Sequence, residues 1–205
     1  MEGRSVKTLK EAKTVRVLGI DPGTAIVGYA IVDDVKKKYE LIACGCIYTD
    51  KSERIENRIA HIFTEVSLLI ELYQPEVVVV EELFFFKNNK TIISVAESRG
   101  VILLAATLKH IPIAEYTPLQ VKMGIASYGR ATKQQVQEMV RRLLGMKEVI
   151  KPDDAADAVA IAITHINGQK FHALGMNTTE TKVKKYSTKT SGNKISLEEY
   201  KKMIK

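Results

Sequence analysis

The stretch VRVLGIDPGTAIVGYAIVDD, residues 15–34, decides how this chain begins to fold. An apolar run ends in a carboxylate, Asp21, and a Pro22-Gly23 pair separates it from a second apolar run over residues 26–33. This pattern predicts two strands joined by a tight connection. An ionised carboxylate at the end of a central strand is costly unless a cation or hydrogen-bond donors compensate it. The stretch therefore predicts the start of a sheet and a compensated charge at its edge.

The remaining sequence alternates between strand and helix patterns. Residues 39–49 are expected to complete an antiparallel meander, and the continuous β-branched run at residues 76–82 is typical of a central strand covered on both faces. A short strand is expected at residues 111–117. Helical spacing and end signals predict an α/β fold with helices from a Ser52 cap to Gln74, at 91–109, from Pro118, from Thr132 to Leu144, and at 153–167.

The composition is that of a soluble globular protein. Of the 205 residues 45% are hydrophobic and 27% charged, and no apolar run approaches the ~18 residues of a membrane span. The N-terminal residues lack the apolar middle segment of a secretory signal, so we expect a cytoplasmic protein with no membrane contact. The two cysteines, Cys44 and Cys46, are too few for a disulfide framework or a zinc cage and are interpreted as plain buried thiols.

Charge is distributed unevenly along the chain. The net charge is +7, yet residues 168–205 alone carry +6. Within the core, residues 87–151 sum to +7, whereas the flanking residues 16–86 and 152–167 sum to −5 and −3. One interpretation is ordinary solvated charge; the other is a basic surface for a polyanion beside a carboxylate-lined metal site.

Further acids recur in the same setting as Asp21. Glu81 follows four valines, and Asp154 and Asp157 lie three residues apart at the start of a helix, hence on one face. Singly, these residues could be a turn former, an edge residue, a helix cap or a solvated charge. Together they can converge only if their charges are neutralised. Hard oxygen ligands suit Mg²⁺ or Mn²⁺, and such a site suits two-metal phosphodiester hydrolysis.

Five blocks spread over residues 15–167 resemble the RuvC family of Holliday junction resolvases, which are RNase H-like endonucleases. The blocks are LGIDPGTAIVGYAIV, VVVVEELFFFKNNKT, ESRGVILLAA, EYTPLQVKMGIASYGRATKQQVQEMVRRLL and PDDAADAVAIAITH. The resemblance implies a five-stranded mixed sheet, an antiparallel meander followed by parallel strands, with helices on both faces. It also implies a nuclease domain (15–168) preceded by an N-terminal extension (1–14). Beyond Gly168 the composition shifts to Lys, Thr, Ser, Gly and Asn, which predicts a flexible basic tail (169–205).

The resemblance assigns metal binding and catalysis to the same four acids that the residue patterns select. Asp21, Glu81, Asp154 and Asp157 match the family's metal ligands, which implies two Mg²⁺ per subunit with Mn²⁺ as a substitute. The neighbouring Glu82 and Asp153 fall outside the family pattern and are candidates for supporting or capping roles.

Several residues are candidates for DNA binding. Phe84 matches a family aromatic that stacks at the junction crossover, although FFF at 84–86 would equally suit a core. Lys122 and Lys133 match family lysines; without the resemblance they would be ordinary surface lysines. The same basic stretch contributes three weaker candidates, Lys87, Arg99 and Arg130.

The resemblance thus implies a homodimer that nicks a four-way DNA junction at two symmetric strands in recombination and repair, leaving 5′-phosphate ends. It implies two further partners, a junction-binding protein and a branch-migration motor. Two alternatives remain: an actin-like ATPase or sugar kinase, whose phosphate hairpin GIDPGT resembles, and a module that binds branched DNA without cutting it. Against the first, no second Asp-Gly hairpin is present in the sequence.

Overall fold

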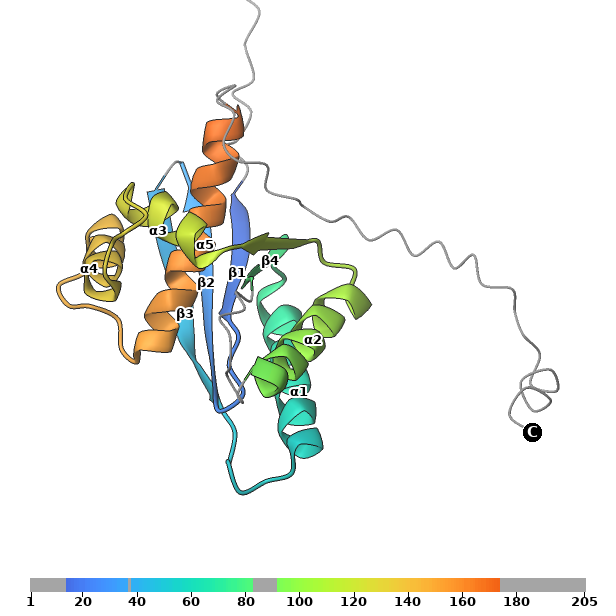
Figure 1. Cartoon of the computed structure of the whole chain (residues 1–205). Coiled ribbons are helices and arrows are strands. Elements are labelled where there is room, and N and C mark those ends of the chain that lie inside the picture. Colours follow the sequence, from blue (N-terminus) through green and yellow to red (C-terminus); the bar gives the residue numbers. More distant parts are fainter. Residues whose placement is uncertain (1–13, 37, 83–91, 174–205) are drawn as a thin grey trace, which may run out of the picture.

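The computed structural model describes residues 14–36, 38–82 and 92–173, in which strands and helices follow one another as expected (Figure 1). The strands are β1 (Val15–Asp21), β2 (Ile26–Val35), β3 (Lys38–Tyr48), β4 (Val77–Glu81) and β5 (Ile113–Tyr116). The helices are α1 (Ile55–Tyr73), α2 (Ile92–Leu108), α3 (Pro118–Ala126), α4 (Lys133–Leu143) and α5 (Asp153–Ala173).

The strands form a five-stranded mixed sheet in the order β3-β2-β1-β4-β5. The first three strands pair antiparallel, whereas β4 and β5 add in parallel on the other side of β1. β1 and β4 are central and carry apolar side chains on both faces, as their continuous apolar runs require. The predicted sheet is therefore confirmed, including its change from antiparallel to parallel pairing.

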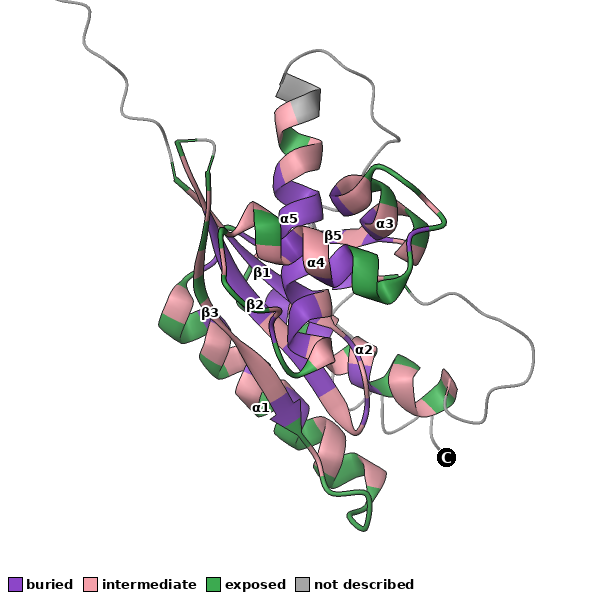
Figure 2. Ribbon diagram, turned by 90° about the vertical axis from the view of Figure 1, so that its left-hand side faces the viewer, coloured by how far each residue is buried: buried purple, intermediate pink, exposed green. Residues whose placement is uncertain are grey.

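Helices cover both faces of the sheet. One core lies between the sheet and α5, with α3 and α4 packed beside that helix; the opposite core lies beneath α1 and α2. Figure 2 shows buried residues concentrated on the strands and along the middle of α5. The alanine-rich sequence of this helix lets it lie almost wholly inside, from Ala155 to Ile166. We call its side of the sheet the α5 face.

The ends of the helices follow local side-chain chemistry. Thr132 forms a capping box that begins α4, which confirms the predicted cap, and α3 begins at Pro118 as predicted, with a second capping box at Thr117. The predicted Ser52 cap is wrong: α1 begins at Ile55 after Arg54, which makes no side-chain cap hydrogen bond. The backbone N–H of Ser52 instead donates to Asp50 Oδ1 at 2.8 Å, a turn in the connection before the helix.

α5 continues six residues beyond its predicted end at 167, to Ala173. Lys170 lies 3.0 Å from Asp34 and 4.5 Å from the centre of the Tyr39 ring, so contacts with the β2–β3 hairpin stabilise the added turn. Residues 169–173 therefore continue the helix. The rest of the expected tail, 174–205, and most of the N-terminal extension, 1–13, lie outside the described residues.

None of the helices in the described part of the chain combines the length and apolar character of a membrane span. Cys44 and Cys46 are free thiols on β3, as predicted, but they are only partly and not fully buried. This partial burial raises the pKa of both.

Candidate active site

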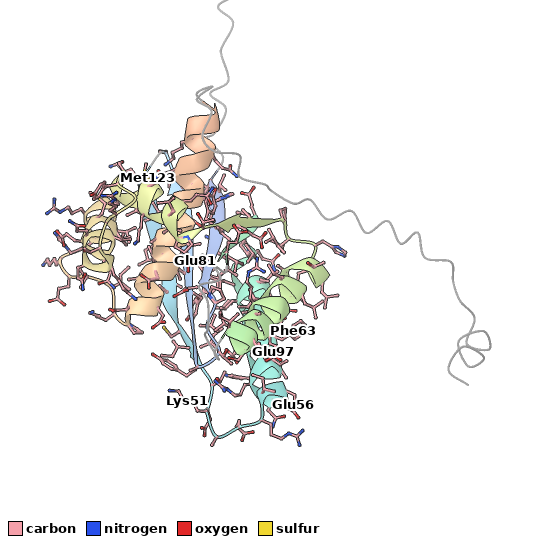
Figure 3. All side chains as sticks on the ribbon, viewed as in Figure 1. Lys51, Glu56, Phe63, Glu81, Glu97 and Met123 are labelled. Carbon is pink, nitrogen blue, oxygen red and sulfur yellow. The ribbon has the colours of Figure 1, made fainter. Side chains whose placement is uncertain are left out.

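The ends of β1 and β4 place two acids side by side. Ile20 of β1 is in register with Val80 of β4, so Asp21 and Glu81 follow at neighbouring positions on one edge of the sheet. Side chains alternate along a strand, and Leu18, Ile20, Val78 and Val80 point toward α1 and α2. Asp21 and Glu81 therefore project to the α5 face. Figure 3 shows Glu81 near the centre of the molecule, between the sheet and the helices.

Two glycines let α5 bring its own acids to this edge. A Cβ at Gly19 would lie 2.3 Å from the carbonyl oxygen of Ala158, and one at Gly28 would lie 2.0 Å from that of Asp154. Both contacts are impossible for any other residue, so the helix backbone rests directly on β1 and β2. Because Gly28 pairs with Asp21 in the sheet, this contact places Asp154, and Asp157 one turn later, beside the strand-end acids.

The acids are close enough to affect one another's protonation. Burial, followed by repulsion from Glu81, Asp157 and Asp154, raises the pKa of Asp21 from 3.8 to about 7. Burial and then the charge of Asp157 raise the pKa of Glu81 from 4.5 to about 7. Burial also raises the pKa of Asp157. Three separate segments thus meet in one partly buried anionic cluster, Asp21, Glu81, Asp154 and Asp157.

Two lysines lie at the rim of this acidic cluster. Lys122 of α3 and Lys133 of α4 line a pocket of about 200 Å³ together with Glu81 and Asp157. The Nζ atom of Lys133 lies 2.7 Å from Asp157 Oδ2, and both lysines lower the pKa of Glu81. The predicted DNA-binding lysines are therefore next to the acids, and one of them already neutralises part of their charge.

The other sequence candidates lie elsewhere. Arg99 projects from α2, on the opposite side of the sheet, and forms an ion pair with Glu115 of β5 in which both side chains are largely buried. This placement indicates a structural role and separates Arg99 from the acidic cluster. Arg130 is exposed in the connection between α3 and α4 and does not line the pocket. Phe84 and Lys87 lie outside the described residues, as do Phe85 and Phe86.

The acids outside the family pattern have structural contacts. The backbone N–H of Glu82 donates to the carbonyl of Tyr116 at 2.8 Å, which extends the pairing of β4 with β5. Asp153 begins α5 and lies 2.6 Å from Lys151 and 3.9 Å from Lys133. Both residues therefore support the ends of elements that carry the acidic cluster.

Sequence reasoning missed the residues that fix the turn after Asp21. Ser98 of α2 is fully buried and donates to the carbonyl of Gly23 at 2.7 Å. From the other side, Thr49 donates through its hydroxyl to the carbonyl of Thr24 at 2.5 Å. A Cβ on Gly23 would lie 2.1 Å from the carbonyl of Ile26, so the turn requires glycine. A polar residue on the buried face of a helix was the available signal for Ser98.

The acidic cluster suits a divalent cation by its chemistry. Four carboxylates supply the hard oxygen ligands that Mg²⁺ and Mn²⁺ prefer, and a divalent ion would relieve the repulsion behind the raised pKa values. Within the described residues, no three acid, histidine or cysteine side chains are already arranged as a metal site. The ammonium group of Lys133 stands beside Asp157 instead. Asp21, Glu81, Asp154 and Asp157 therefore fit the ion in chemistry and burial.

Comparison with known proteins identifies the family. The family model for crossover junction endodeoxyribonuclease RuvC matches residues 17–165. The chain belongs to the RuvC family. A crossover junction endodeoxyribonuclease RuvC of Fusobacterium nucleatum is 51% identical over 93% of this chain and all of that protein. One of Caldicellulosiruptor saccharolyticus is 51% identical over 74% of this chain and 92% of the relative.

Solved structures agree with this assignment. A structure of Thermus thermophilus RuvC is 34% identical and has a TM-score of 0.71, covering 79% of this chain and 98% of that protein. A second, T. thermophilus RuvC in complex with Holliday junction substrate, has a TM-score of 0.69 at 34% identity and covers 78% and 96% of the two chains. The resemblance inferred from sequence is confirmed, and family membership decides against the actin-like ATPase.

Proposed function

We propose that this chain is a Holliday junction resolvase, an endonuclease that cuts four-way DNA junctions by metal-dependent hydrolysis at Asp21, Glu81, Asp154 and Asp157. Membership of the RuvC family supports the activity and the metal dependence. The observation that carries the site is the cluster itself. Two strand ends and one helix start bring four acids together, and burial with mutual repulsion raises the pKa of Asp21 and Glu81 to about 7.

The proposed cofactor is Mg²⁺, two ions per subunit, with Mn²⁺ as a substitute. Such ions, when bound, would lower the pKa of an attacking water and stabilise charge on the leaving oxygen. The protein's part is to hold the ions through ionised carboxylates on a rigid frame of β1, β4 and α5. The products are 5′-phosphate and 3′-hydroxyl ends.

The substrate phosphate is proposed to approach through the pocket lined by Lys122 and Lys133. Ammonium groups at that rim attract the backbone of DNA, and Lys133 stands at the start of α4, where the helix dipole favours an anion. The T. thermophilus relative is solved with a Holliday junction substrate, which supports a four-way junction as the DNA. Phe84 and Lys87 remain candidate DNA contacts.

A homodimer is proposed because a junction with two-fold symmetry presents two equivalent strands. The resemblance to the RuvC family implies a dimer contact through the helix at about 91–108, which corresponds to α2. The exposed side chains of Ile93, Leu104 and Leu108 on α2 support an apolar contact there. Residues 15–168 are proposed to form the nuclease domain and residues 169–205 the basic tail, of which 169–173 belong to α5. A cytoplasmic location, a junction-binding protein and a branch-migration motor complete the proposal.

One incubation tests the activity. The full chain is mixed with a four-way junction, linear duplex or RNA–DNA hybrid of matched sequence, with and without Mg²⁺. We expect paired nicks in the junction alone and only with Mg²⁺. Asp21→Asn should still retard the junction in a gel but leave it intact. A wild-type protein that binds the junction without cutting it in Mg²⁺ or Mn²⁺ would instead be the binding module.

A further inference from the structure

The ammonium group of Lys133 stands where a cation is needed. Its Nζ atom lies 2.7 Å from Asp157 Oδ2 and 3.9 Å from Asp153 Oδ2. The capping box of Thr132 and Gln135 fixes the backbone of Lys133 as the first helical residue of α4, and from there the side chain reaches across the pocket to α5. The contact therefore joins two elements through the acidic cluster rather than along one helix.

This single positive charge acts on several acids. Lys133 opposes the rise in the pKa of Asp21, Glu81 and Asp157, although burial still raises all three. Lys151, in contrast, is exposed and pairs with Asp153 at 2.6 Å, outside the four-acid cluster. Lys133 is thus an internal counter-ion of the cluster, and it compensates only part of the charge.

We propose that Lys133 is an exchangeable counter-ion, which holds Asp157 in the metal-free protein and releases it when divalent ions bind. This inference rests on the proposed function, because it assumes that Asp157 is a metal ligand. An ammonium 2.7 Å from Asp157 Oδ2 takes up one acceptor site of this carboxylate, and a divalent ion bound to the same group would repel it. The two cations therefore compete for Asp157.

The released side chain has a second use. The Lys133 side chain is 48% exposed on a flexible four-carbon stem, so it can leave Asp157 and turn toward solvent and a DNA phosphate at the same rim. Metal binding would then strengthen DNA binding, and by linkage DNA binding would strengthen metal binding by the same factor. The protein would hold its metal ions loosely until DNA is present.

Metal affinity without DNA distinguishes this exchange from a simple phosphate contact. Isothermal titration calorimetry with Mn²⁺ is performed on the full wild-type chain, on Lys133→Met, and on Lys151→Met as a control that removes the same charge from a neighbouring ion pair. We expect Lys133→Met to bind Mn²⁺ about fivefold more tightly than wild type, as the loss of one competing, partly exposed ion pair implies. Lys151→Met should stay within about twofold, and Lys133→Arg, which keeps the charge, should resemble wild type.

The opposite sign is expected for DNA. In the presence of Mn²⁺, Lys133→Met should bind the junction more weakly than the wild type does. Mn²⁺ should also raise the DNA affinity of this variant by a smaller factor than it raises that of the wild type. Mn²⁺ affinity that is unchanged or weaker in a folded Lys133→Met protein overturns the exchange and leaves the proposed function standing. If the wild type binds the junction but does not cut it in Mn²⁺ or Mg²⁺, the proposed function itself fails, whatever the Mn²⁺ affinities.

Discussion

Replacing Asp21 by asparagine tests whether the acidic cluster is electrostatically strained without metal. The change removes one buried charge and keeps the shape of the side chain. We expect the metal-free variant to be more stable than the wild type at pH 8, and the difference to shrink toward pH 5. Holding like charges together lowers the stability of the folded protein, so the loss of one of these charges should raise it, even though the residue is needed for catalysis.

The magnitude follows from protonation. The folded protein holds a proton on Asp21 up to a pH of about 7, whereas the unfolded chain loses it near 3.8. Because the folded state binds more protons in this window, stability falls as pH rises from about 4 and stops falling above about 7. Roughly three pKa units at about 1.4 kcal/mol each correspond to about 4 kcal/mol at pH 8.

Asparagine should recover about 2–4 kcal/mol of that loss, since its amide remains buried beside carboxylates. For a domain of this size the gain corresponds to a melting temperature roughly 5–15 °C higher. Thermal unfolding followed by circular dichroism, in EDTA from pH 5 to pH 9, measures it. Glu97→Gln is the matched control, because Glu97 is exposed on α2, away from Glu81 (Figure 3). Equal pH profiles for wild type and Asp21→Asn would refute strain at Asp21.

Three further predictions concern the frame around the acidic cluster. Gly28→Ala should lower junction cleavage at least about tenfold and destabilise the fold by several kcal/mol, because a Cβ there would meet the carbonyl of Asp154 at 2.0 Å. Cleavage rates and thermal melts measure the two effects. A variant that cuts at the wild-type rate would contradict the close packing of α5 on β2. Ser98→Ala should lower the free energy of unfolding by about 1–3 kcal/mol, because the carbonyl of Gly23 loses its donor. Chemical denaturation measures this loss, and an unchanged midpoint would show that the hydrogen bond contributes nothing to stability. Millimolar Mg²⁺ should raise the melting temperature of the wild type but not that of Asp21→Asn at pH 8, and equal shifts for both would place the ion elsewhere.

The sequence predicted the sheet and the acids because both depend on short-range patterns. Residues 17–20 and 77–80 carry no polar side chain, as central strands need, and each run is followed by an acid that a buried strand would otherwise exclude. Thr132 was identifiable as a cap because Gln135 completes the box three residues later. Family resemblance added the lysines, which carry no sequence signal of their own.

Other features depend on contacts between distant segments. Ser52 has the chemistry of a cap, but Asp50 orders the preceding turn and the helix begins later. The last turn of α5 forms because Lys170 meets Asp34 across more than a hundred residues of chain. Gly28 inside a strand signals a close backbone approach, although its partner, the start of α5, becomes apparent only in the fold.

The counter-ion role of Lys133 is invisible in the sequence for the same reason. Nothing local distinguishes it from the neighbouring basic residues, and its pairing with Asp157 arises from the packing of α4 beside α5. The placement of Arg99 shows the converse, since a basic residue in the same charged stretch lies on the other side of the sheet, paired with Glu115. Charge counts along a chain do not reveal the face on which each charge lies.

Anomalous diffraction from crystals grown with Mn²⁺ would locate the ions among the side chains and show whether the four acids form the metal site. We expect Mn²⁺ within about 2.5 Å of carboxylate oxygens of Asp21, Glu81, Asp154 and Asp157, with Lys133 no longer bonded to Asp157. Protein that cuts junctions at the same Mn²⁺ concentration, yet shows no Mn²⁺ peak at these four acids, would contradict this expectation.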